Sequence, residues 1–252
     1  MILVTVGSVV GTFIVIGLLI QVLQRAVPHP LRQQHNEVAG FVYAVMGVLF
    51  AVVLAFVVVN EWEALDTAKQ NTFTEADELG SLYWNSRAMP ADVGRALETT
   101  TKEYASLVID QEWPLLDSGG YSTRATDLVY QMRDEINALP SDTPREQTLY
   151  DQSLQHINNL AAARRARLSE SSDKVPAILW AALIMGAVLT VGYTFLFGLP
   201  KFWSHVLIAG PLAALVVLGL VVIELLDHPF GGMIAVQPEA FEIFLRGLPV
   251  QR

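Results

Sequence analysis

Ionisable side chains at the ends of apolar segments are the residues of this sequence best suited to chemistry. Two lie where one apolar segment begins, two follow that segment, and three follow a later one: His35, Glu37, Glu61, Glu63, Glu224, Asp227 and His228. Charged groups near hydrocarbon are costly, so they are usually paired or line a wet cavity. The sequence thus offers candidates for an ion or proton pathway. The alternative for the last three is a structural role at a helix end.

Metal binding and catalysis receive little support from the same residues. His29, His35 and Glu37 are ligand types that suit zinc or iron, but their spacing matches no established motif. Interfacial residues bonded to water and lipid headgroups are the simpler interpretation. The chain has no cysteine, which excludes thiol catalysis and zinc–thiolate sites. We therefore expect no enzyme, and no catalytic, cofactor or metal site.

Four long apolar runs must position these side chains. They cover residues 2–23, 41–59, 177–199 and 203–225. Each is close to the roughly 20 residues that a helix needs to cross a bilayer. The pattern predicts an all-α integral membrane protein of the cell membrane with four transmembrane helices in two pairs, in contact with membrane lipids.

The segment between the two pairs is acidic. It holds 11 Lys and Arg and 20 Asp and Glu, so the whole formal charge of −9 belongs to it. A nucleic-acid-binding protein needs a basic surface instead. We therefore expect no nucleic-acid partner.

Periodicity predicts that this insert is an antiparallel helical bundle. Tyr150, Leu154, Ile157 and Ala161 recur in steps of three and four. Thr143–Glu146 has the pattern of a capping box with proline at the first helical position. The predicted divisions are 1–60, two spans; 61–174, the bundle; 175–226, two further spans; and 227–252, a turn and a short interfacial helix. We expect both ends of the bundle to continue into spans.

Small residues recur along the spans at intervals of four. Gly7 and Gly11 form one such pair, and Gly186 and Gly210 belong to others. Such spacing lets helices approach closely in lipid. It fits packing within the chain, with packing between subunits as the alternative.

The positions of basic residues bear on orientation. Arg25, Arg32 and Lys201 lie in the short loops, and the positive-inside rule places these loops in the cytoplasm. The insert is then extracytoplasmic. The basic residues that we expect near the membrane on the insert side argue the other way: Lys69, Arg164, Arg165, Arg167 and Lys174.

Three groups of residues together resemble the bacterial bestrophin-like domain family of membrane proteins, whose function is unknown. They are 35–40 with Glu61-Trp62 and Glu75-Ala76; Arg164 to Leu168 with Pro176 and Leu179-Trp180; and Asp227, Pro229, Phe230 and Gly232. The resemblance implies a relation to bestrophins, which are oligomeric anion channels with a cytosolic helical region, opposite to the orientation favoured by the charges. The chain lacks an obvious acidic calcium clasp.

Two functions from different classes follow. One is an oligomeric ion channel or permeation pathway, most simply a homo-oligomer. The alternative is an accessory or structural subunit of a membrane complex, whose helical insert docks a partner or ligand. The span 41–59 has no Asp, Glu, Lys, Arg or His, so a channel through it would need a hydrophobic constriction that gates by dewetting.

Overall fold

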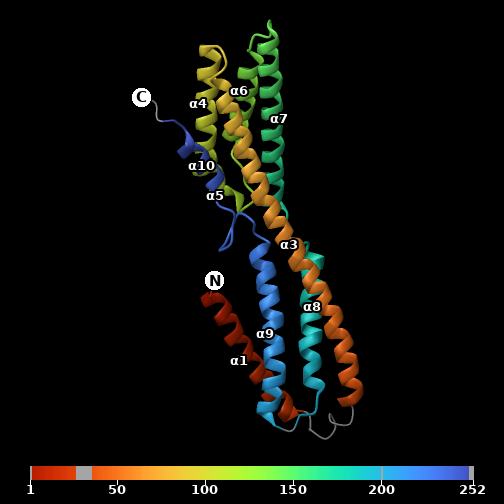
Figure 1. Cartoon of the computed structure of the whole chain (residues 1–252). Helices are drawn as coiled ribbons and strands as arrows, with labels where there is room; N and C mark the ends of the chain where they lie inside the picture. Colours follow the sequence, from red (N-terminus) through yellow and green to blue (C-terminus); the bar gives the residue numbers. More distant parts are fainter. Residues whose placement is uncertain (1, 27–35, 200, 250–252) are drawn as a thin grey trace. The chain divides into compact units, whose positions relative to one another are not determined.

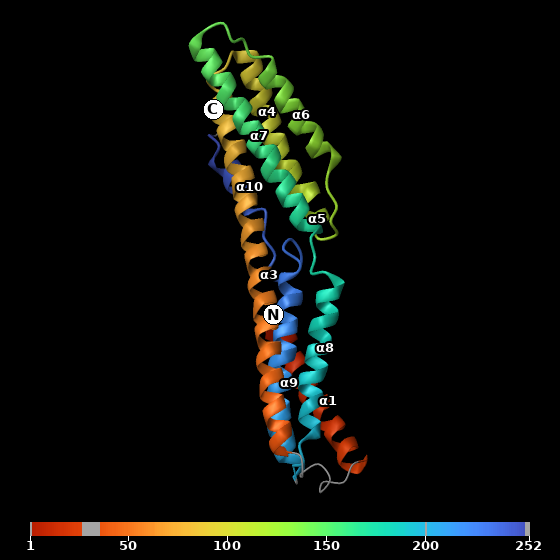
Figure 2. The ribbon, with the colours of Figure 1, turned by 90° about the vertical axis from the view of Figure 1, so that its right-hand side faces the viewer.

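The computed structural model describes residues 2–26, 36–199 and 201–249, and all regular secondary structure in these ranges is helical (Figure 1, Figure 2). The chain forms two compact units. The apolar unit comprises Met1–Trp62 and Lys174–Asp227, and the charged unit comprises Glu63–Asp173 and His228–Arg252. Each unit is therefore assembled from two separate stretches of sequence.

The apolar unit contains α1 (Ile2–Ala26), the first part of α3 (Asn36–Ser86), α8 (Ala177–Tyr193) with the short 3₁₀-helix η2 (Thr194–Leu196), and α9 (Phe202–Leu226). Among the described residues, three helices are long and apolar enough to cross a membrane, those covering Ala39–Ser86, Ala177–Leu196 and Phe202–Leu226. A shorter apolar stretch, Gly7–Val22, lies within α1. These lengths are those of transmembrane helices.

Glycine allows the helices of the apolar unit to approach one another. A Cβ atom at Gly210 of α9 would collide with the ring of Phe13 on α1, and one at Gly186 of α8 would collide with the ring of Phe50 on α3. At Gly7 and Gly11 of α1 such an atom would meet nothing within 4 Å. Packing within the chain thus accounts for Gly186 and Gly210, but it does not account for the Gly7–Gly11 pair.

The helix preceding α8 ends before the membrane span, contrary to the expectation that the insert continues into both spans. α7 (Pro144–Ser172) stops at Ser172, and α8 starts only after Pro176. Proline disfavours helical geometry in the residue before it, here Val175. The backbone N–H of Val175 donates instead to the Asp227 carboxylate, with 2.6 Å between nitrogen and oxygen. By contrast, α3 is a single helix from Asn36 to Ser86.

The charged unit is built from the second part of α3 with α4 (Ala91–Leu107), the π-helix η1 (Val108–Glu112), α5 (Trp113–Leu116), α6 (Thr123–Asn137), α7 and α10 (Glu239–Gly247). Within it, α4, α6 and α7 lie side by side with α3 (Figure 1, Figure 2). Their apolar faces share one core that includes Leu79, Leu97, Tyr104, Leu128 and Ile157. The predicted capping box at the start of α7 is confirmed, since Thr143 and Glu146 bond reciprocally.

The C-terminal helix α10 uses its apolar face inside the charged unit, where the sequence suggested a helix in the membrane interface. The Phe241 side chain is fully buried, and Phe244 and Leu245 pack against the same core. The Trp113 indole N–H donates to the Val236 carbonyl across 3.3 Å, which secures the segment before α10. The hydrophobic periodicity of α10 thus reflects packing on protein.

Candidate functional site

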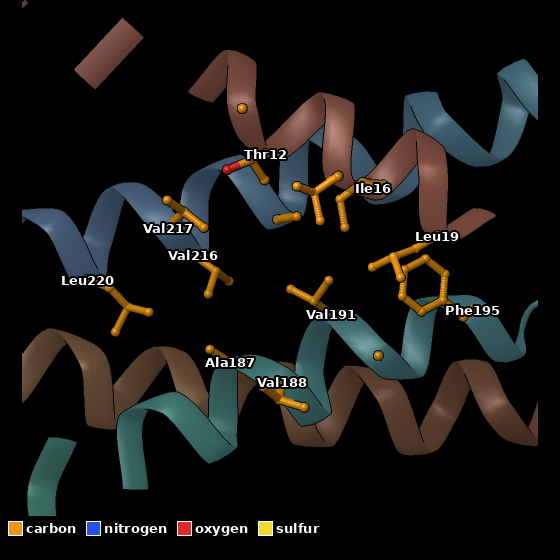
Figure 3. Close-up of a pocket in the computed structure, with 14 residues that line it drawn as sticks. Thr12, Ile16, Leu19, Ala187, Val188, Val191, Phe195, Val216, Val217 and Leu220 are labelled. Atoms are coloured by element: carbon orange, nitrogen blue, oxygen red, sulfur yellow. The ribbon is translucent and has the colours of Figure 1, made fainter. Parts of the chain in front are cut away.

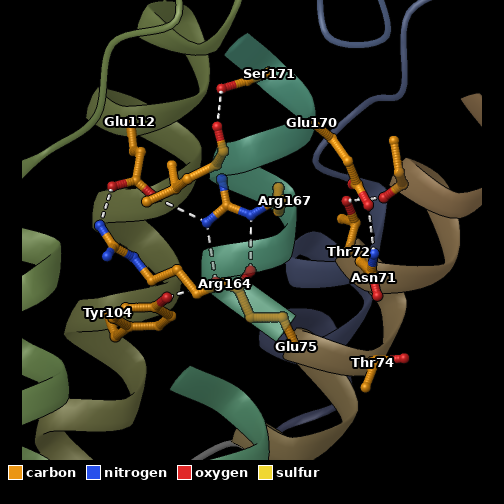
Figure 4. Close-up of polar contacts among 12 residues, drawn as sticks. Asn71, Thr72, Thr74, Glu75, Tyr104, Glu112, Arg164, Arg167, Glu170 and Ser171 are labelled. Atoms are coloured by element: carbon orange, nitrogen blue, oxygen red, sulfur yellow. Dashed lines mark hydrogen bonds and ion pairs between the residues drawn. The ribbon is translucent and has the colours of Figure 1, made fainter. Parts of the chain in front are cut away.

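Arg167 of α7 lies at the centre of a buried cluster of charges in the charged unit (Figure 4). Its Nε donates to Glu75 Oε2 at 2.7 Å, and its Nη2 donates to Glu75 Oε1 at 2.9 Å. The same Nη2 donates to Glu112 Oε1 at 2.8 Å. A paired arrangement of this kind fixes geometry as well as charge. Arg167 therefore joins α3, η1 and α7 at one point.

Arg164 and Tyr104 extend this cluster. Arg164 Nη2 donates to Glu112 Oε2 at 2.5 Å, and the backbone N–H of Ser122 donates to the same oxygen at 2.9 Å. The Tyr104 hydroxyl of α4 donates to Glu75 Oε1 at 2.5 Å. Two guanidinium groups thus balance two carboxylates, as a group of buried charges requires.

Local backbone structure places these side chains. Arg164 and Arg167 are three residues apart and so share one face of α7. Glu112 is the last residue of the π-helix η1, and π-turns are often found where a side chain has a special task. The rings of Trp113 and Phe241 cover the Arg167 guanidinium, with centroids 5.4 and 5.9 Å from its central carbon.

Burial and charge act in opposite directions on these groups. Burial alone would raise the pKa of Glu112, but the attraction and hydrogen bonds of Arg167 and Arg164 outweigh it and lower the pKa below its usual range. Burial and the nearby Glu75 carboxylate raise the pKa of Tyr104 well above that of a free tyrosine. Burial opposes the charge of Arg167, yet Glu75 holds its pKa above the usual value. Tyr104 and Arg167 therefore keep their protons, and the cluster serves to link helices.

Further polar pairs connect α3 and α7 on either side of this cluster. Asn71 Nδ2 donates to Glu170 Oε1 at 2.6 Å, and His156 Nδ1 lies 2.6 Å from Glu78 Oε2. Burial raises the pKa of Glu170, although Asn71 and Arg167 oppose the rise. Specific polar partners thus join Asn71–Glu78 of α3 to His156–Glu170 of α7.

The candidate residues of the sequence analysis are dispersed. His29 and His35 lie outside the described residues, and so does the side chain of Glu37, which belongs to α3. Glu61 is half-buried and accepts a hydrogen bond from Asn60, whereas Glu63 and Glu224 are exposed and His228 is half-buried. In the described ranges, no three His, Asp or Glu side chains are arranged to hold a metal ion.

Asp227 has a structural position among these candidates. It is buried in the apolar unit, where it accepts the Val175 N–H that the proline-induced break releases. An unpaired buried N–H would be costly. Asp227 thus ties the end of α9 to the segment that precedes α8.

The buried cluster itself is not among the sequence candidates. Arg164 and Arg167 were expected near the membrane, but both are buried in the charged unit. One signal could have revealed this: they continue the three- and four-residue steps of Ser153, Ile157 and Leu160, which are buried on the same helix. Glu112 carries the same signal, because it lies four residues after the buried Val108.

Helices of membrane-spanning length and composition, together with a helical unit built around paired charges, define this chain as a multi-pass helical membrane protein. Residues 10–241 match the model of the bestrophin-like domain. The chain belongs to the bestrophin-like family, as the sequence resemblance indicated.

Solved structures show the same fold. A bacterial bestrophin homologue from Klebsiella pneumoniae is 14% identical, with 94% of this chain and 96% of that chain aligned and a TM-score of 0.70. Two single-residue variants of the homologue each give a TM-score of 0.71. The first is 14% identical, with 94% of this chain and 96% of that chain aligned. The second is 13% identical, with 96% of each chain aligned. No protein among those with curated descriptions matches.

Proposed function

We propose that this chain crosses the membrane four times, with α1 as the additional span, and assembles into an oligomeric ion channel or permeation pathway. The observation that supports this most directly is the uncovered apolar face of α3. Only 11% of the most apolar stretch of α3 is buried, compared with 39% for α9. Family membership and the shared fold are consistent with the proposal.

The membrane part of α3 has two opposite faces. One face packs within the apolar unit: Tyr43 stacks on Tyr193 with ring centroids 6.1 Å apart, and Leu54 fills the space beside Gly219. The opposite face is exposed along its whole length, at Phe41, Val45, Val48, Val52, Phe56 and Val59. These two sets differ by about half a helical turn at 3.6 residues per turn.

A ring of copies that turned the exposed faces of α3 inward would enclose a narrow apolar passage. Such a passage conducts when it is wet and closes when it dewets. Because the face carries no ionisable side chain, a small polar group should make wetting easier. Ion flux therefore gives a direct measure of whether this face lines the pathway.

The test compares wild type, Val52→Ser and Met185→Ser in liposomes at equal protein density. We expect wild-type vesicles to pass small ions and Val52→Ser to pass them faster. Met185→Ser, on an exposed position of α8, should leave the flux unchanged. Vesicles that stay impermeable to ions at high protein density, together with a monomeric particle, would rule the proposal out.

The accessory role is the second candidate, and exposed aromatic side chains of the charged unit favour it. Trp84, Tyr121 and Tyr130 are all exposed, and aromatic residues are enriched where proteins bind one another. Purification in mild detergent should then yield a complex with a fixed partner. A monodisperse particle that contains only this chain would count against this role.

For orientation, we propose that the insert lies outside the cytoplasm. The pairing of Arg164 and Arg167 with buried carboxylates supports this, because these arginines are not free to interact with lipid headgroups. Since the chain has no cysteine, single cysteines can report the sidedness. A membrane-impermeant maleimide should label Asp142→Cys in intact cells but not Lys201→Cys; the reverse pattern would place the insert in the cytoplasm.

The exposed carboxylates Glu63 and Glu224 remain candidates for the mouth of such a pathway. Acidic side chains near a pore entrance attract cations and repel anions. If they line the entrance, Glu63→Gln and Glu224→Gln should shift the reversal potential of the reconstituted protein toward anions. An unchanged reversal potential would leave them as surface residues.

A further inference from the structure

We propose that a groove in the apolar unit binds one acyl chain of a membrane lipid. The groove lies between α1 and α8, with α9 as its floor (Figure 3). The cavity has a volume of about 560 Å³. The inference does not depend on the proposed channel, but it rests on the proposed placement of α1 in the membrane beside α8 and α9.

The lining of the groove suits hydrocarbon and offers nothing to a polar ligand. Among the described lining residues, only Thr12 has a polar side chain. Its hydroxyl already donates to the Ser8 carbonyl at 2.7 Å, one turn earlier in α1. A polar ligand would lose its hydrogen bonds to water without replacement here.

The groove is closed at its floor and open at its rim. Ile16, Ala213 and Val216 are buried at the bottom, whereas Leu19 and Val188 are exposed at the edges. Figure 3 shows side chains of α1 and α8 pointing toward one another across the space. The groove is built from α8 and α9, which are long and apolar enough to cross a membrane, and from the shorter apolar stretch Gly7–Val22 of α1. With all three helices in a membrane, the open side faces the hydrocarbon of the bilayer.

The size of the groove selects one acyl chain over a helix. A methylene group is about as large as a water molecule, roughly 30 Å³, so the cavity has room for roughly 18 such groups. Three turns of an α-helix, about 10 Å wide and about 16 Å long, need roughly 1,200 Å³. A single lipid tail fits inside the groove, whereas a helix from a second copy would have to project from it.

Van der Waals contacts with the walls should retain the acyl chain in the groove. The hydrophobic effect does not favour transfer from the bilayer into the groove, because lipid tails are as apolar as the lining. An empty groove, however, leaves its walls without van der Waals partners. A chain enclosed on three sides regains those contacts, so it should exchange more slowly than lipid on the outer helix surfaces.

The experiment uses the full chain in nanodiscs of phosphatidylcholine with a photoactivatable diazirine in one acyl chain. After irradiation, mass spectrometry counts the adducts at each residue. We expect the groove residues Val191 and Val216 to carry at least threefold more adduct than Leu207, which is exposed on α9 outside the groove. Equal labelling at these positions would overturn the proposal.

A pair of variants separates groove binding from general lipid contact. Gly11 lines the groove and Gly7, one turn earlier, does not. A Cβ atom at either position meets nothing within 4 Å. Gly11→Leu should therefore reduce adducts at Val191 and Val216 at least threefold, while Gly7→Leu leaves them unchanged.

Gly192→Leu gives the same test from the opposite wall, where an added Cβ atom also meets nothing within 4 Å; it serves if Gly11→Leu does not fold. The groove variant, either Gly11→Leu or Gly192→Leu, is compared with the control Gly7→Leu. If the two give equal adduct yields at Val191 and Val216, the proposal is overturned. Adducts at Leu207 without adducts at Val191 and Val216 would overturn it as well, because lipid would then be excluded from the groove, as it would be by a second subunit.

Discussion

Helices of the apolar unit approach where glycine on one helix meets a large side chain of another, as at Gly210 with Phe13 and Gly186 with Phe50. In the charged unit, α3 and α7 are linked instead through ionised and polar side chains around Arg167. The difference follows from the solvent. In lipid the hydrophobic effect does not drive helices together, so their association depends on close van der Waals packing. In water an apolar core supplies the drive, and the buried charges help to specify which helices pair.

The largest effect should come from removing one partner of the buried charges. Arg167→Ala leaves Glu75 and Glu112 without their shared counter-ion, so we expect a loss of about 3–5 kcal/mol in the stability of the charged unit. Hydrogen exchange of α7 and η1 in the purified protein measures it. The exposed pair of Arg124 with Glu103 gives the control, since Arg124→Ala should cost at most about 1 kcal/mol. Equal losses in the two variants would show that the cluster does not hold this unit together.

The next effect should fall on the apolar unit alone. In Gly210→Ala the new methyl group collides with Phe13, and overpacking of this kind costs about 1–3 kcal/mol. Thermal melting in detergent should show the loss, with α1 exchanging first. Gly7→Ala, which meets no neighbour within 4 Å, should melt like wild type. Equal destabilisation of both variants would show that the contact with Phe13 does not explain the glycine at position 210, since helix propensity alone would make both alanine variants more stable.

A smaller effect belongs to the start of α7. Thr143→Ala removes the capping box with Glu146 and should cost about 1 kcal/mol in the charged unit. Thr148→Ala is the control, because that hydroxyl bonds only to the Pro144 carbonyl of its own helix. Hydrogen exchange in the first turn of α7 separates the two variants; similar exchange would mean that the cap contributes little.

The last effect depends on pH and has opposite signs at two glutamates, and it is small at Glu170. The raised pKa of Glu170 means that its contribution to stability is greatest in acid and is lost as the pH rises through that pKa. Glu170→Gln should therefore stabilise the charged unit slightly at pH 7, with no gain well below the usual carboxyl pKa of about 4.3.

Glu112 has a lowered pKa, so its contribution to stability is present above about pH 4.3 and is lost as the pH falls. Glu112→Gln should thus destabilise at pH 7, and a denaturation series at several pH values tests both signs.

Local patterns in the sequence predicted the features that local physics determines. The apolar runs indicated a membrane protein because a bilayer demands their length. The capping box at Thr143 was correct because it involves only neighbouring residues. The charge cluster could not be predicted in the same way, since Glu75, Glu112 and Arg167 are brought together only by the packing of three segments. Periodicity also could not distinguish a protein surface from a membrane surface as the partner of α10.

The position of Phe241 in the core has a consequence for biosynthesis. Residues 228–247 are translated after α9, yet Phe230, Val236 and Phe241 belong to the core of a unit whose other helices precede α8. Until those residues leave the ribosome, the nascent unit exposes the apolar surface that they later cover, and such intermediates are prone to aggregate or to be degraded. The core of the charged unit can therefore be completed only after translation has passed beyond α9.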